Sequence, residues 1–186
     1  MTPSRIGKFL TLMEFVTCTE TYQAFQKEIS PYPSNEESIR AIEELCSNLL
    51  DPLIDHFGFE SFKLTYGFCS KDLKRCLNKK KPNGEKWGRV DPTRDQHMAC
   101  ETNSKDAYYC SRKGAACDLR FEGISSKKIV EFILQAKLPF DRLYFYGSDR
   151  PIHISYGPDH TRYICIFNGD SRIPRKAPVN WLELAG

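Results

Sequence analysis

The sequence predicts an α+β domain in which an antiparallel-rich sheet packs on helices. Helical patterns dominate the first third of the chain, most strand patterns follow after position 110, and one helical pattern interrupts those strands. The 186 residues match the usual length of one domain, which we expect to span 1–186. Hydrophobic residues make up 40% and aromatic residues 12%, which suffices for a core without disulfide bonds and argues against disorder.

The strongest helical pattern covers about 35–56. Its apolar residues recur every three or four positions, as on one face of a helix that packs on a sheet: Ile39, Ile42, Leu45, Cys46, Leu49, Leu50, Leu53 and Ile54. Ser34 and Glu37 form a capping box ahead of it, and Pro52 predicts a kink or a break near its end. Weaker patterns predict helices at about 8–15, 20–28 and 70–77, and another after Ser125 or Ser126 that extends to about 134.

Five short segments have the composition of strands. They lie at about 62–66, 116–121, 142–146, 152–156 and 162–167. Between the first two strands runs a long irregular segment, and a stretch of this length inside a compact domain usually serves a function. It contains a basic loop and a cysteine-containing insertion at about 79–113, and a second irregular segment forms the tail at 169–186.

Charge and targeting signals exclude little. The formal net charge is only +3, which is too small to identify a nucleic-acid binder. No uninterrupted apolar run forms a secretory leader or is long enough to span a bilayer, so we expect a cytoplasmic protein without a membrane span. In that compartment the eight cysteines are expected as free thiols, some of them available to a metal; disulfides are the alternative.

Three residues have the chemistry of a zinc site. Such a site needs nitrogen, oxygen or sulfur ligands at one point, with one position left open if it is catalytic. Side chains alternate between the faces of a strand, which places His153 on the polar face of 152–156 and Asp118 on the polar face of 116–121. His97, in the preceding loop, can supply a third ligand, so His97, Asp118 and His153 are candidate zinc ligands.

Short motifs around these residues resemble the M15-type zinc D-Ala-D-Ala carboxypeptidases, which share a fold with the hedgehog signalling domain. That family carries S-x-H-x-x-G-x-A-x-D and, on a later strand, W-x-H-x-S. The counterparts here are Asp95-Gln96-His97, Gly114-Ala115-Ala116-Cys117-Asp118 and Pro151-Ile152-His153-Ile154-Ser155. The similarity extends from about Phe9 to Phe167 and includes FLTLMEF, the long helix and Tyr66-Gly67-Phe68-Cys69-Ser70. The resemblance implies the hedgehog/D-Ala-D-Ala peptidase fold, Zn²⁺ bound by His97, Asp118 and His153, and hydrolysis of a peptide or related amide bond, such as one in a cell-wall-like substrate.

The chain departs from the family pattern at three places. His97 and Asp118 are 21 positions apart rather than seven, so an insertion of about fourteen residues must loop out before the Asp-bearing strand. Cys69 stands where the family has an arginine that binds substrate charge. The segment 147–152, directly before His153, contains no glutamate, and Asp149 is the nearest carboxylate that could carry the catalytic proton.

Two further groups of residues complete the candidate site. Lys79, Lys80, Lys81, Lys86, Arg89 and Arg94 make the loop before His97 basic, which suits either a solvated loop or an anionic partner. The residues expected to line a substrate cleft are Arg94, Tyr109, Arg112 and Ser155. A rival structural zinc site would combine His97 with Cys100, Cys110 and Cys117, although no C-x-x-C pair supports it.

Three functions therefore remain open at this stage. The first is the zinc-dependent peptidase-type hydrolase. The second is a recognition module that kept the fold and lost the chemistry, as the missing arginine and glutamate suggest. The third is an enzyme repurposed for an anionic, nucleic-acid-like substrate.

Overall fold

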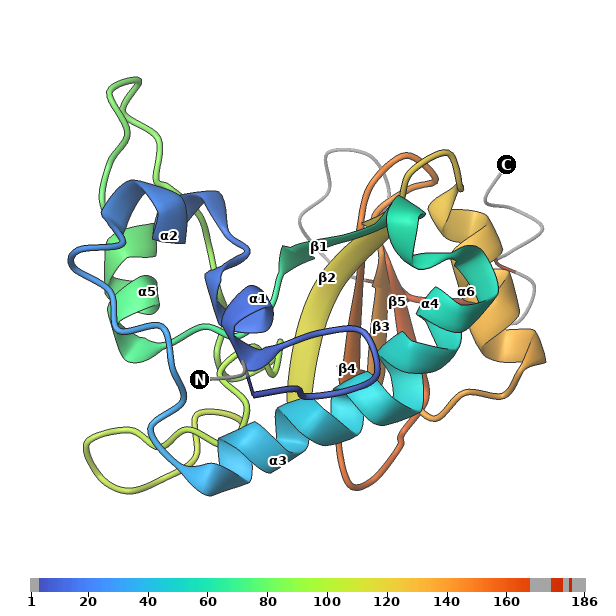
Figure 1. Ribbon diagram of the computed structural model, residues 1–186, viewed down its shortest axis with the longest axis horizontal. Coiled ribbons are helices and arrows are strands. Elements are labelled where there is room, and N and C mark those ends of the chain that lie inside the picture. The colour runs from blue at the N-terminus through green and yellow to red at the C-terminus, as the bar shows by residue number, and fades with distance from the viewer. Residues whose placement is uncertain (1–3, 168–174, 179–180, 182–186) are drawn as a thin grey trace.

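The computed structural model describes residues 4–167, 175–178 and 181, which form a mixed α+β structure with a six-stranded sheet (Figure 1). The helical elements are α1 (Leu12–Thr17), α2 (Glu20–Phe25), α3 (Glu36–Leu45), η1 (Cys46–Leu50), α4 (Asp51–Phe57), η2 (Phe59–Ser61), α5 (Lys71–Leu77) and α6 (Ser126–Gln135). The strands are β1 (Phe62–Tyr66), β2 (Ala115–Phe121), β3 (Arg142–Phe145), β4 (Ile152–Tyr156), β5 (Tyr163–Ile166) and β6 (Arg175–Lys176). None of the described helices is long and apolar enough to cross a membrane.

The strands lie in the order β1-β2-β4-β3-β5-β6. Every neighbouring pair is antiparallel except β3 and β5, which confirms the expected antiparallel-rich sheet. β4 lies between β2 and β3 in the sheet. The strand that carries Asp118 therefore lies beside the strand that carries His153. The two-residue β6 was not expected, because the sequence suggested only an irregular tail; 168–174, 179–180 and 182–186 of that tail lie outside the described residues.

The long helical segment continues through Pro52 rather than breaking there. A π-helical turn, η1, joins α3 to α4, and the amide of Asp51 donates to the carbonyl of Cys46. Proline cannot donate the next helical hydrogen bond and clashes with the preceding turn, and the wider π turn accommodates this without ending the helix. The expected cap was also wrong by one residue, since the side chain of Asn35, not Ser34, accepts a hydrogen bond from the amide of Ser38.

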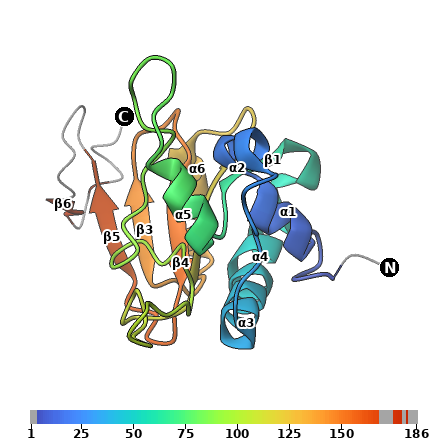
Figure 2. The same cartoon turned by 90° about the vertical axis from the view of Figure 1, so that its left-hand side faces the viewer.

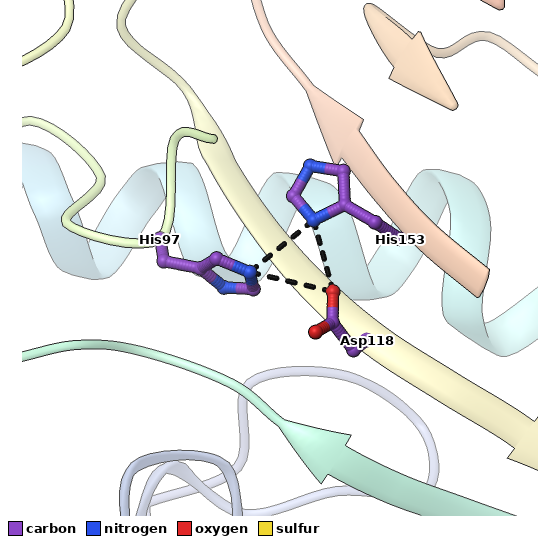
Figure 3. Close-up of side chains that lie close together, drawn as sticks. All are labelled: His97, Asp118 and His153. Carbon is purple, nitrogen blue, oxygen red and sulfur yellow. Dashed lines mark hydrogen bonds and ion pairs between the residues drawn. The ribbon is translucent and has the colours of Figure 1, made fainter. Parts of the chain in front are cut away.

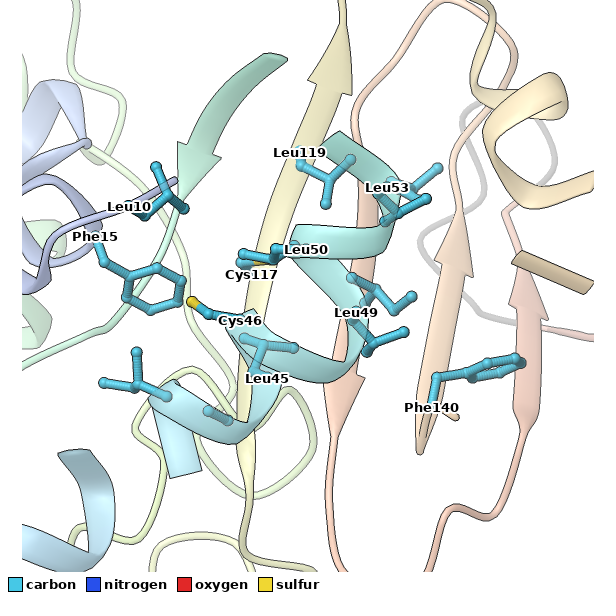
Figure 4. Packing of buried hydrophobic residues seen from close by; sticks show 14 of the residues in the cluster. Leu10, Phe15, Leu45, Cys46, Leu49, Leu50, Leu53, Cys117, Leu119 and Phe140 are labelled. Carbon is cyan, nitrogen blue, oxygen red and sulfur yellow. The ribbon is translucent and has the colours of Figure 1, made fainter. Parts of the chain in front are cut away.

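The main hydrophobic core lies between the helices α3, η1 and α4 and one face of the sheet (Figure 4). Leu45, Leu49, Leu50 and Leu53 from the helices are fully buried there, together with Leu119 from β2. Figure 2 shows these helices on one side of the sheet and α5 with the loop after it on another. The α2–α5 side has its own smaller apolar cluster. The opposite face of the sheet is therefore left for the polar residues of β2 and β4.

Capping explains why the first helix begins later than expected. The side-chain oxygen of Thr11 accepts a hydrogen bond from the amide of Glu14, and the carboxylate of Glu14 accepts one from the amide of Thr11. This capping box starts α1 at Leu12 instead of near Lys8.

The segment between α5 and β2 is irregular, as expected, but it is well anchored. Glu101 is buried, with 2% exposure, and its carboxylate accepts hydrogen bonds from Ser34, Asn35 and Ser38 at the start of α3. A negative charge is favourable at a helix N-terminus, so this carboxylate holds the insertion against α3. All eight cysteines are free thiols in this structure, and seven of them are buried.

Candidate metal centre

Antiparallel pairing of β2 and β4 brings Asp118 and His153 together. Their Cα atoms are direct partners in the register, and directly opposed residues project to the same face of a sheet. The apolar neighbours Cys117 and Leu119 enter the core on the other face, as the alternation predicted. The Nδ1 atom of His153 lies 2.9 Å from Oδ1 of Asp118.

His97 completes a triangle from the loop that precedes the insertion (Figure 3). Its Nε2 atom lies 3.2 Å from Nδ1 of His153 and 3.4 Å from Oδ1 of Asp118. The structure thus brings the three expected ligands together. Among the described residues, these three side chains form a cluster that could hold a metal ion.

A neighbouring backbone carbonyl fixes which nitrogen of His97 faces the cluster. Nδ1 of His97 lies 2.9 Å from the carbonyl oxygen of Gly67, and because a carbonyl can only accept, Nδ1 carries the proton. The neutral ring therefore presents the lone pair of Nε2 to the cluster, as in metal sites where an outer hydrogen bond orients the histidine. Only glycine fits at position 67, since a Cβ atom there would lie 2.1 Å from the carbonyl oxygen of Phe15.

Two tyrosines pack against the histidine rings. The ring of Tyr144 stacks on His153 with centroids 4.5 Å apart and an interplanar angle of 19°. The edge of Tyr66 meets His97 at a centroid distance of 4.6 Å. Both tyrosines restrict the rotation of the imidazoles, which preorganises the site. The sequence reasoning missed both, although each lies one strand away from a predicted ligand.

The electrostatics show that the cluster attracts positive charge. Burial lowers the pKa of His97, but the charge of Asp118 and its hydrogen bond, with a smaller contribution from Asp95, raise it to about 9. Burial raises the pKa of Asp118, but His97 and His153 outweigh that effect and hold it well below its usual range. In the metal-free protein, a proton on His97 therefore offsets the charge of Asp118.

The donor atoms fit a zinc ion. Tetrahedral zinc with ligands at about 2.0–2.1 Å separates neighbouring ligand atoms by about 3.3 Å. The three separations of 2.9, 3.2 and 3.4 Å are close to that value. The side chains of His97 and His153 are 6% and 2% exposed, whereas Asp118 retains 28%, so the cluster opens to solvent on the Asp118 side.

The remaining candidate residues lie around the cluster in different environments. Ser155 is fully buried, and its hydroxyl donates to Oε1 of Gln96. Arg112 lies with Nε 3.4 Å from Oδ2 of the buried Asp141. The side chain of Arg94 is 74% exposed, while its carbonyl accepts a hydrogen bond from the Tyr144 hydroxyl. None of these contacts tests substrate binding, which stays a prediction.

Tyr109 and Asp149 lie outside the triangle. Tyr109 is half-buried against the α2–α5 cluster, with the ammonium of Lys74 4.6 Å from its ring centroid. Asp149 is exposed in the loop between β3 and β4, where it lines a hollow of about 500 Å³ with 120–126 and residues 148 and 150. Its role as proton carrier stays a prediction.

The cysteines of the rival zinc site do not converge. Cys117 lies in the main core on the face of β2 away from Asp118, and Cys110 donates to the carbonyl of Thr93. Burial raises the pKa of Cys117 well above its ordinary value, which disfavours the thiolate that zinc needs. No cluster containing a cysteine appears among the candidate metal sites of the described residues.

Comparisons of the chain with protein-family models, with curated proteins and with solved structures find no match.

Proposed function

We propose that the protein is a zinc-dependent hydrolase of the M15 peptidase type, acting on a peptide or related amide bond. The observation that carries this proposal is the triangle of His97, Asp118 and His153, which is buried on the histidine side and open on the Asp118 side. Three protein ligands with an open position are typical of catalytic zinc, whereas structural zinc usually has four protein ligands.

Two imidazole nitrogens and a carboxylate oxygen form a donor set that zinc accepts well. Zinc held there would supply a Lewis acid for a carbonyl oxygen and would lower the pKa of water. His97 and His153 form the buried side of the site, and Asp118 borders the opening through which a substrate would reach it. Asp149 is the proposed proton carrier, because the segment 147–152 before His153 contains no glutamate.

Metal analysis tests the site. Purified wild-type protein should contain about one zinc per chain, and His153→Ala should contain almost none. His56→Gln is the matched control, because His56 stacks on Phe132 and is not part of the triangle. Equal zinc in His153→Ala and in the wild type would exclude the site.

One observation favours a recognition module as the second candidate. Cys69, at the position of the family's substrate-binding arginine, is fully buried in the α2–α5 apolar cluster and cannot reach a substrate. In this reading the zinc site stabilises a binding surface and turns over nothing. Hydrolysis of cell-wall-type peptides that is abolished by a chelator and restored by zinc would exclude it, and the absence of turnover by zinc-loaded protein would favour it.

The positive charge of the loop after α5 favours an anionic substrate as a further candidate. Residues 71–94 contain nine lysines and arginines but only three acidic residues, and the loop after α5 projects from the body of the protein (Figure 1). Binding to single-stranded nucleic acid that weakens steeply with salt, and that is lost in a Lys80/Lys86/Arg89→Gln triple variant, would support this substrate class. Unchanged binding in the triple variant would assign the affinity elsewhere.

A further inference from the structure

The insertion raises a physical question about the first zinc ligand. Sixteen residues, 98–113, separate His97 from Gly114, yet Nε2 of His97 lies 3.2 Å from Nδ1 of His153, compared with 2.9 Å between that atom and Oδ1 of Asp118. Some contact must fix the loop at position 97 against β4 despite the length of chain that follows it.

The side chain of Gln96 makes that contact. It is fully buried, and its backbone has a φ of 58°, a left-handed conformation that is rare for a residue other than glycine. Strain of this kind persists only where surrounding interactions hold the residue in place.

Both ends of the Gln96 amide are engaged. Its Oε1 accepts a hydrogen bond of 2.7 Å from the hydroxyl of Ser155, and its Nε2 donates one of 2.7 Å to the carbonyl of Lys113. The hydroxyl of Ser155 also accepts from the amide of Arg142, so the contact reaches β3 as well as β4. One side chain thus connects both ends of the insertion to the two strands.

The far end of the insertion is fixed in the same place. Gly114 has a φ of 74°, and a Cβ atom there would lie 2.0 Å from the carbonyl oxygen of Tyr156. The close backbone contact at Gly114 and the side-chain amide of Gln96 together hold the two ends of segment 98–113, so that this segment loops out without displacing His97.

We propose that Gln96 is a positioning residue for the metal centre. It closes the insertion onto Ser155 and sets the imidazole of His97 at zinc-binding distance from His153. This inference rests on the zinc site proposed above. Outer partners that orient metal ligands typically change metal affinity by about 10- to 100-fold when they are removed.

Two substitutions test the hydrogen bonds that the side chain of Gln96 makes with Ser155 and Lys113. Gln96→Met keeps the approximate size of the side chain and removes both hydrogen bonds, whereas Ser155→Ala removes only the bond to Oε1. We expect zinc affinity, measured by competition with a chromophoric chelator, to fall about 10- to 100-fold in Gln96→Met and by a smaller factor in Ser155→Ala.

Ser126→Ala is the matched control. Ser126 is also buried, and its hydroxyl donates to the carbonyl of Arg150, so its removal costs a similar hydrogen bond outside the triangle. A merely structural role predicts equal zinc affinity in all three variants once each is shown to be folded, and that result would overturn the proposal.

A metal-independent measurement separates this inference from the zinc proposal. In metal-free protein, hydrogen exchange across 96–114 should accelerate in Gln96→Met but not in Ser126→Ala. Wild-type protein that binds no zinc would refute the proposed function, and the exchange result would still decide whether Gln96 closes the insertion. Unchanged hydrogen exchange across 96–114 in Gln96→Met would refute the claim that the side chain of Gln96 closes the insertion.

Discussion

Raising the pH from 7 to 9 should tighten zinc binding by about 50-fold. The charge of Asp118 and its hydrogen bond raise the pKa of His97 to about 9, so this imidazole is protonated at neutral pH in the metal-free protein. Zinc needs the lone pair on Nε2, and binding must therefore release one proton. Below pH 9 the apparent affinity falls about tenfold for each pH unit, which amounts to about 3 kcal/mol at pH 7.

The assay is a chelator competition at several pH values, with the pH dependence of the chelator itself removed. The logarithm of the affinity should rise with a slope near one and level off close to pH 9. Asp95→Asn provides an internal check, because the charge of Asp95 is a smaller cause of the raised pKa of His97. Its removal should move the break to lower pH.

An affinity that is constant between pH 7 and 9 would refute this reasoning, because it would mean that no proton competes with the metal. An unchanged break in Asp95→Asn would show that this carboxylate does not act on His97. The slope, the position of the break and its displacement are three independent readings of the same electrostatic arrangement.

Three further predictions concern stability, each measured by urea unfolding. In metal-free protein the raised pKa of His97 stabilises the fold fully below about pH 6.5, and about 3 kcal/mol of this is lost as the pH rises through 9; His97→Gln should lack that loss. Gly67→Ala should destabilise the fold by more than about 2 kcal/mol, because its Cβ would lie 2.1 Å from a backbone oxygen of α1, whereas Gly123→Ala meets nothing within 4 Å and should cost only about 1 kcal/mol of backbone strain. Glu101→Ala should cost about 2–4 kcal/mol because it leaves buried donors at the start of α3 unpaired, and a cost no larger than that of the exposed Glu122→Ala would contradict this.

The strand part of the site could be predicted from the sequence because it depends on a local rule. Alternation along a strand assigns Asp118 and His153 to the polar faces of their strands, whichever strands pair. The apolar residues next to each of them in the sequence lie in the core, on the other face. The pairing of β2 with β4 adds the register, which no local pattern contains.

His97 could be named as a candidate third ligand from its chemistry and its motif, but the contact that places it could not be predicted. Gln96 and Ser155 are 59 positions apart, and a hydrogen bond between buried side chains leaves no periodic trace in either segment. The same holds for Glu101 and Ser34, which join the insertion to α3 across 67 positions.

The predictions of local helix details, the cap before α3 and the break at Pro52, were wrong for a different reason. Ser34 and Asn35 are both good N-cap residues, and the choice between them depends on Glu101, which recruits Ser34 for its own hydrogen bonds. The π turn before Pro52 likewise depends on packing, since burial of Leu49 and Leu50 keeps the helix continuous where proline alone would favour a break.

Crystallography of zinc-loaded protein at the zinc absorption edge would locate the metal ion itself. We expect a single anomalous peak within about 2.0–2.2 Å of Nε2 of His97, Oδ1 of Asp118 and Nδ1 of His153, with a fourth position open on the Asp118 side. A peak on cysteine sulfurs, or no peak at the triangle in protein soaked with zinc at pH 9, would contradict it.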